Sequence, residues 1–154
     1  SDVTVRTLAA QPTLVVRGKV AVDDMPAWLC RSYVAVERLA ADAGTQLAGP
    51  PFARYRPLDS EFREFEVEAG FAVADETEGE GDVEALMLPA GPVAAAWHIG
   101  PYETMAATYE AVMAFLAENR AEALGAPWEV YHSDPVTQPD PTTWRTEIIQ
   151  PFIA

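Results

Sequence analysis

Residues 49–55 read GPPFARY and residues 125–131 read GAPWEVY, so one pattern of turn residues followed by strand-forming residues occurs twice, 76 residues apart. At the same offset, Tyr33 corresponds to Tyr109. Both tyrosines lie in segments whose apolar residues recur with the period of an α-helix. This repetition predicts a chain built from two copies of one module, each with a helix followed by strands.

The coarse order of elements, β-α-β-β, is predicted to occur twice. The first copy has β-branched strand segments around one helix, with strands at 3–8, 12–22, 52–57 and 61–69 and the helix at 25–43. The second copy has strands at 84–99, interrupted by Pro89 and Gly91-Pro92, and at 127–132 and 143–149, with a helix at 103–123. The expected fold class is α+β: a duplicated βαββ module with pseudo-two-fold symmetry, an antiparallel sheet with two helices on one face, and a central ligand groove.

The expected organisation is a single domain over residues 1–154, which is long enough to bury a core without disulfides or metals. Its two repeats are placed at about 1–74 and 84–154, and the acidic segment 75–83 (DETEGEGDV) is expected to be a solvated linker. This segment lacks the ordered ligand spacing of a calcium-binding EF-hand loop. The two histidines and Cys30 also lack the spacing of metal ligands, so no metal is expected.

The charge balance excludes several classes of function. The chain has 24 acidic and 10 basic side chains and a formal charge of −14, whereas nucleic-acid binders present basic surfaces. The same charge repels anionic lipids, and no apolar run approaches the ~20 residues of a membrane span. The N-terminal residues lack the apolar region of a signal peptide. We therefore expect a cytoplasmic protein that does not bind nucleic acid directly and does not enter a membrane.

Strand alternation predicts which side chains reach the central groove. Near the C-terminus, Trp128 and Val130 are expected to face the helices, so that Glu129 points the opposite way, into the groove. The same alternation applied to both repeats gives the groove two tyrosines, an arginine and up to three carboxylates: Tyr55, Glu66, Glu129, Tyr131, Arg145 and Glu147. Grooves between two halves of a domain are favoured positions for ligand sites.

Several stretches resemble the GyrI-like family of small-molecule-binding domains. They are GPPFARY at 49–55, LPAGPV at 88–93, HIGPY at 98–102, WEVY at 128–131 followed by Asp134-Pro135, and WRTEI at 144–148. In multidrug-sensing regulators of the AraC and MerR types, this domain follows a DNA-binding domain. Here the sequence starts on the first predicted strand, so a stand-alone member is expected. Ala53 stands where the other repeat has Glu129, so the groove is expected to be acidic on one side only.

The resemblance implies a groove that binds hydrophobic aromatic molecules, often cationic drugs or toxins, without a cofactor. Glu129 resembles the family's buried glutamate, with Tyr131 and Tyr102 as its aromatic neighbours. Trp97 and Trp144 are further candidates for ligand binding, and the strand face that carries Trp97 is left open. A carboxylate among aromatic rings can receive a cation, because charge attraction and the ring faces act together.

Two other functions remain open. Some stand-alone members of the family hydrolyse cyclopropane-containing genotoxins, and the resemblance allows a cofactor-independent hydrolase with Glu129 and Tyr131 as catalytic residues. A desolvated carboxylate has a raised pKa and can act as a general base, and Glu147 and Tyr102 are alternatives for these roles. The family also includes an inhibitor of DNA gyrase, so a protein-interaction module that uses the acidic run 75–84 is the third hypothesis. An exposed edge-strand position for Glu129 also stays open.

Overall fold

The chain is organised in two units whose bounds differ from those of the predicted repeats. The computed structural model describes residues 2–154; one unit is Ala10–Pro89, and the other combines the residues up to Ala9 with Ala90–Ala154. The difference arises because the first strand pairs within the second of these units and not with its own repeat. The repeats and the domain limits stay a prediction, and Ser1 lies outside the described residues.

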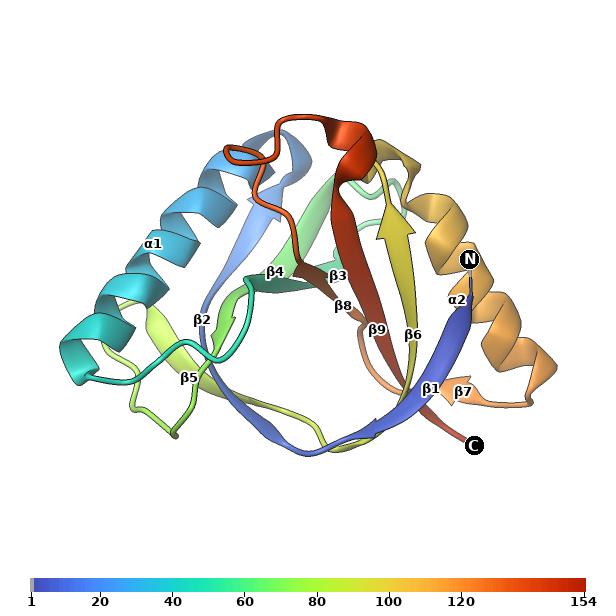
Figure 1. Ribbon diagram of the computed structural model, residues 1–154, viewed down its shortest axis with the longest axis horizontal. Helices are drawn as coiled ribbons and strands as arrows, with labels where there is room; N and C mark the ends of the chain where they lie inside the picture. Colours follow the sequence, from blue (N-terminus) through green and yellow to red (C-terminus); the bar gives the residue numbers. More distant parts are fainter. Residues whose placement is uncertain (1) are drawn as a thin grey trace. The chain divides into compact units, whose positions relative to one another are not determined.

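Four antiparallel strands and one helix form the unit Ala10–Pro89 (Figure 1). The strands lie in the order β3-β4-β2-β5, with the bounds β2 (Gln11–Ala21), β3 (Phe52–Pro57), β4 (Glu64–Ala72) and β5 (Val83–Leu88). A short turn, η1 (Val22–Asp24), leads into α1 (Met25–Ala43), which covers one face of this sheet. Leu14, Val36 and Phe71 belong to the buried cluster between helix and sheet. Gly44, with φ of 73°, ends α1 in the left-handed conformation that favours glycine.

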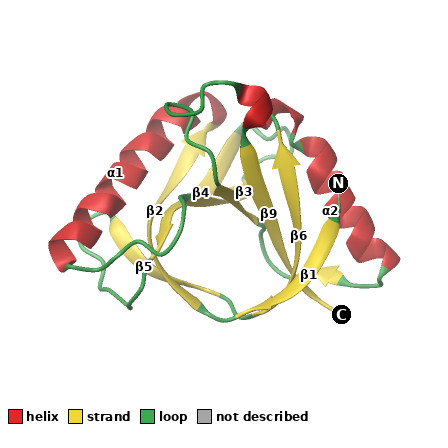
Figure 2. Cartoon of the chain, viewed as in Figure 1, coloured by secondary structure: helices red, strands yellow, loops and turns green. Residues whose placement is uncertain are grey.

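The second unit has the same layers but a different set of strands (Figure 2). Its strands lie in the order β1-β6-β9-β8, with a short β7 also paired to β9, and all pairs are antiparallel. The bounds are β1 (Val3–Leu8), β6 (Gly91–Ile99), η2 (Tyr102–Thr104), α2 (Ala106–Glu118), β7 (Glu122–Ala123), β8 (Trp128–Tyr131), η3 (Pro141–Thr143) and β9 (Arg145–Ile153). α2 covers one face, and Val112, Leu116 and Ile148 are buried beneath it.

The expected fold class is confirmed: the protein is α+β, with antiparallel strands and two helices. The first helix has the predicted bounds. The second helix is shorter than the predicted 103–123, because this segment begins as the 3₁₀ turn η2 and the α-helix ends before Arg120. Arg120 has a φ of 54°, which turns the backbone toward β7.

The strand predicted at 61–69 begins three residues later, at Glu64. Before it, the Asp59 carboxylate accepts hydrogen bonds from the backbone N–H groups of Arg63 (2.9 Å) and Glu64 (3.3 Å). Phe62 adopts a φ of 56° inside this turn. Aspartate commonly stabilises such turns through its own side chain. Because these turn hydrogen bonds compete with those of the sheet, β4 begins later than predicted.

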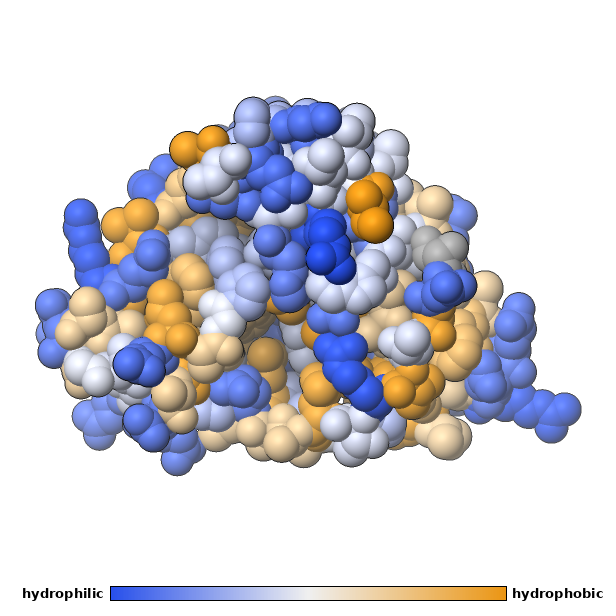
Figure 3. Space-filling view, in the orientation of Figure 1, coloured by the Kyte–Doolittle hydropathy of each residue, from blue (hydrophilic) through white to orange (hydrophobic). Residues whose placement is uncertain are grey.

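The acidic segment 75–83 lies inside the unit Ala10–Pro89, where most of its residues are exposed. Exposed polar residues also follow the end of α2, and Figure 3 shows hydrophilic side chains around that end. Within residues 2–154, no helix has the length and apolar character needed to cross a membrane.

Candidate functional site

Glu129 lies on the face of its sheet that α2 covers. It stands opposite Ile148 in the β8–β9 pair, and Ile148 belongs to the core cluster beneath α2. Residues directly opposite one another in an antiparallel pair share a face. The prediction that Trp128 and Val130 would face the helix was therefore wrong. It failed because the other face is also buried at this point: Trp128 stands opposite Ile149, and both are almost fully buried.

The Glu129 carboxylate accepts hydrogen bonds from two tyrosines. Tyr131, two residues along β8 and on the same face, donates its hydroxyl to Oε1 at 2.8 Å. Tyr109, on α2, donates its hydroxyl to Oε2. Each carboxylate oxygen is thus held by a phenol, which fixes the orientation of a partly buried charge between strand and helix.

The environment of Glu129 disfavours its charged form. Burial raises the pKa of Glu129, while the hydrogen bonds from Tyr109 and Tyr131 and the nearby His98 act in the opposite direction; the net effect is a raised pKa. A carboxylate that is desolvated and stabilised mainly by neutral phenols gains from the arrival of a positive charge. The site is therefore suited to a cation, or else the carboxyl group keeps its proton at a higher pH than an ordinary glutamate does.

Two more aromatic rings complete the group. The Tyr102 ring lies 5.8 Å from that of Tyr131 in an edge-on arrangement and 5.0 Å from that of Trp144. Trp144 donates its indole N–H to the carbonyl oxygen of Gln138 at 2.6 Å, which orients the ring. We call Tyr102, Tyr109, Glu129, Tyr131 and Trp144 the Glu129 cluster.

The phenol of Tyr102 stays protonated at neutral pH. Burial raises its pKa, and the charges of Glu129 and Asp134 raise it further. Tyr102 can therefore act as a hydrogen-bond donor to a ligand, and because the residue is 41% exposed, it can contact one from the solvent side.

His98 holds the turn that carries Tyr102. Its ring is buried, and Nε2 lies 2.8 Å from the carbonyl oxygen of Pro101, which can only accept, so Nε2 carries the proton and donates. Nδ1 lies 3.2 Å from the hydroxyl oxygen of Thr108 on α2. The Thr104 hydroxyl also donates to the Pro101 carbonyl, at 2.9 Å. His98 thus connects β6, the turn η2 and α2 behind the Glu129 cluster.

Two predicted site residues lie on the opposite face of the same sheet. Glu147 stands opposite both Val130 and Trp97, away from the α2 side, and pairs with both terminal nitrogens of Arg6 at 3.0 and 3.2 Å. The Arg145 guanidinium lies 4.4 Å above the Trp97 ring. The prediction that Glu147 and Arg145 share a groove face with Glu129 was therefore wrong, and Trp97 also lies away from Glu129. Successive pairs in β8 and β9 send Ile148 and Glu147 to opposite sides, so only one of them can join Glu129.

Tyr55 and Glu66 belong to the unit Ala10–Pro89. The Tyr55 ring makes an edge-on contact with Phe65 at 6.1 Å, and Glu66 stands opposite Arg56 and Lys19 in the sheet. A role for either residue in ligand binding stays a prediction.

Sequence reasoning missed a buried ionic group in that unit. Glu68, which is 2% exposed, accepts hydrogen bonds from Arg54 (2.6 Å), Arg17 (2.8 Å) and Arg56 (3.0 Å). Burial acts to raise the pKa of Glu68, but Arg54 and Arg56 outweigh it and hold the pKa below the usual value. A signal was available in the sequence. Arg54 and Arg56 share one face of their strand, Glu66 and Glu68 share one face of the next, and the two strands pair.

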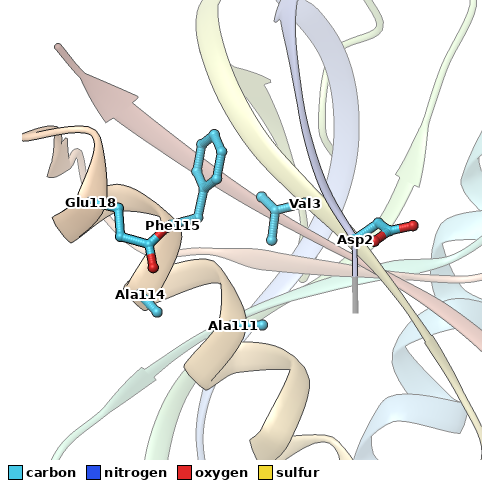
Figure 4. Close-up of a pocket in the computed structure, with 6 residues that line it drawn as sticks. All are labelled: Asp2, Val3, Ala111, Ala114, Phe115 and Glu118. Carbon is cyan, nitrogen blue, oxygen red and sulfur yellow. The ribbon is translucent and has the colours of Figure 1, made fainter.

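A shallow groove of about 490 Å³ lies between the start of β1 and α2 (Figure 4). Its lining combines apolar and acidic side chains: Asp2, Val3, Ala111, Ala114, Phe115 and Glu118. None of these residues belongs to the Glu129 cluster. Among residues 2–154, no group of three or more His, Cys, Asp or Glu side chains is arranged to hold a metal ion.

Comparison with known families decides the relationship. The model of the GyrI-like small molecule binding domain matches residues 1–153. The chain belongs to this family. No curated protein matches it significantly.

Solved structures share the fold of this GyrI-like domain. The C-terminal domain of EcmrR is 22% identical, with a TM-score of 0.84 over 99% of this chain and 97% of that one. In the EcmrR–DNA complex, the matched region is 57% of the EcmrR chain. A hydrolase from Listeria innocua is 16% identical (TM-score 0.74, covering 98% and 91% of the two chains). SAV2435, in a structure with bound tetraphenylphosphonium, is 12% identical (TM-score 0.67, covering 100% and 95%).

Proposed function

We propose that this domain binds hydrophobic aromatic molecules at the Glu129 cluster and prefers cations, as a multidrug or toxin receptor of the cytoplasm. The observation that carries the proposal is the Glu129 carboxylate, which is partly buried, has a raised pKa, and takes its hydrogen bonds from the neutral phenols of Tyr109 and Tyr131. Such a charge is more costly to bury than one paired with an arginine. A bound cation offsets that cost.

The surrounding rings favour organic cations over metal ions. The Tyr131 hydroxyl donates to the carboxylate, the Tyr102 ring contacts that of Tyr131, and the Trp144 ring contacts that of Tyr102. Aromatic faces attract organic cations and also provide apolar surface, whereas small hard ions need several oxygen ligands. The fold relative SAV2435 was solved with tetraphenylphosphonium, an aromatic cation of this kind, which supports the choice of ligand class.

The proposal is tested by comparing two ions of the same shape and opposite charge. Tetraphenylphosphonium is expected to bind the domain at least about tenfold more tightly than tetraphenylborate, because the carboxylate repels the anion. Isothermal titration calorimetry at physiological salt measures both dissociation constants, and salt screens the surface charge that would otherwise contribute. Equal affinity for the two ions, or tighter binding of the borate, would overturn the proposal.

A hydrolase is the second candidate function. The same raised pKa of Glu129 suits a general base that activates water, and Tyr102 and Tyr131 could donate to a developing oxyanion. A fold relative from Listeria innocua is described as a hydrolase. The two functions are separated by mass spectrometry of a cyclopropane-bearing aromatic electrophile after incubation with the domain: a receptor returns it unchanged, and a hydrolase adds water.

A further inference from the structure

Thr146 is a buried hydroxyl without a hydrogen-bond partner beside the Glu129 cluster. It is 1% exposed, and within residues 2–154 its Oγ1 is one of two buried side-chain polar atoms that lack a partner. Buried hydroxyls in folded proteins are nearly always hydrogen-bonded, because an unmet hydroxyl has lost its bond to water without replacement. The exception therefore needs an explanation.

The register places Thr146 between two groups already described. It stands opposite Tyr131 in the β8–β9 pair and opposite His98 in the β6–β9 pair. These residues share the face that carries Glu129 and Ile148. Thr146 lies two residues from Trp144, whose ring contacts the partly exposed Tyr102. It is thus next to the Glu129 cluster in the sheet.

The neighbouring polar groups are engaged with other partners. Both ring nitrogens of His98 are within hydrogen-bond distance of partners, the Pro101 carbonyl and the Thr108 hydroxyl. Both oxygens of Glu129 accept from Tyr109 and Tyr131. Since His98 and Glu129 already have partners, the Thr146 hydroxyl beside them is left without one and can bond to a ligand.

We propose that Thr146 is a specificity-determining residue of the ligand site and accepts a hydrogen bond from an N–H group of an aromatic cation. This inference rests on the proposed function and narrows its ligand class. The nearby carboxylate makes the local potential negative, so a donor hydrogen is favoured here over an acceptor oxygen. The preferred ligands are then amino-substituted aromatic cations, rather than cations whose surface is entirely hydrocarbon.

The test compares two cations on three proteins. Proflavine carries amino N–H groups, whereas tetraphenylphosphonium has none. Thr146→Val, which keeps the side-chain shape, is expected to weaken proflavine about tenfold and to change tetraphenylphosphonium by less than about twofold. Thr146→Ser keeps the hydroxyl and is expected to retain most of the proflavine affinity. Melting temperatures of the free variants check folding, and Thr146→Val is expected to melt no lower than the native domain, since it removes an unmet hydroxyl.

The outcomes separate this inference from the proposed function. If Thr146→Val weakens both cations equally, or neither, while the native domain binds both, the role of Thr146 is wrong and the cation receptor stands. Loss of proflavine affinity in Thr146→Ser equal to that in Thr146→Val also overturns it, because the hydroxyl would then be irrelevant. If the native domain binds neither cation, the proposed function and this inference both fail.

Discussion

Glu68→Gln is expected to lower the free energy of unfolding by about 3 kcal/mol, the lower end of the range for removing one partner of a buried ion pair. Glu68 is the common acceptor of Arg17, Arg54 and Arg56, and its own side chain is 2% exposed. Arg54 is the critical partner because only 11% of its side chain is exposed, so it cannot turn to solvent when the carboxylate is lost. Arg17 and Arg56 are about 40% exposed and can regain water, which limits the loss.

Urea denaturation of Glu68→Gln and of a matched control measures this effect. Glu61→Gln is the control, because Glu61 pairs with Arg63 at 3.1 Å while both side chains are largely exposed. Exposed pairs contribute little, so this variant is expected to unfold at nearly the native midpoint. If the Glu68 and Glu61 variants have the same midpoint, the buried ionic group does not stabilise the unit.

The contribution of Glu68 also depends on pH with a definite sign. Its pKa in the folded state is lowered, so its stabilisation is complete above the pKa of an unfolded-chain glutamate and is lost as pH falls through the lower, folded-state pKa. The difference in stability between the native domain and Glu68→Gln is therefore expected to shrink in acid.

Glu129→Gln is expected to weaken tetraphenylphosphonium binding about 10- to 100-fold, or ~1.4–2.8 kcal/mol. Glutamine keeps the length of the side chain and an oxygen that can accept from Tyr109 or Tyr131, so the aromatic ring arrangement is preserved. What is lost is the desolvated charge, which attracts a bound cation with little screening. A neutral aromatic molecule of similar size is expected to bind nearly as well as before.

Glu110→Gln is the matched control for this variant. Glu110 lies on α2 next to Tyr109 in sequence, but it is exposed, so its replacement changes the net charge equally without altering the cluster. Calorimetric titrations of both variants separate local charge from overall charge. Equal weakening in the two would assign the cation preference to the −14 net charge and not to Glu129.

Local signals explain why so much of the fold could be predicted. The bounds of the first helix followed from Pro26 in its first turn and Gly44 beyond its end, both of which act through their own backbone. The pairing of β1 with β6, which belongs to the other predicted repeat, was not predictable, because partners such as Val3 and Ala96 are remote in sequence. No local propensity specifies which distant strand forms a pair.

The candidate site was predicted in part for the same reason. Glu129 and Tyr131 were grouped correctly because residues two apart on a strand share a face. The sheet face predicted for these two residues was wrong. Both faces of β8 pack against buried residues, so the position of its apolar side chains could not show which face the helix covers. Tyr109 was noted only for its correspondence to Tyr33, because its bond to Glu129 joins a helix to a strand and no local pattern indicates such a contact. Thr146 carries no signal in the sequence; only the count of hydrogen-bond partners identifies it.

The pKa of the Glu129 carboxyl, followed by NMR with and without saturating tetraphenylphosphonium, tests the central claim most directly. In the free domain, burial keeps this pKa above the ordinary value for glutamate. A cation held against the carboxylate stabilises its charged form, so the pKa is expected to fall on binding, and the affinity for the cation is expected to rise with pH through the free-state pKa. A Glu129 pKa that does not change when the cation is bound would contradict the account, because the cation would then lie elsewhere.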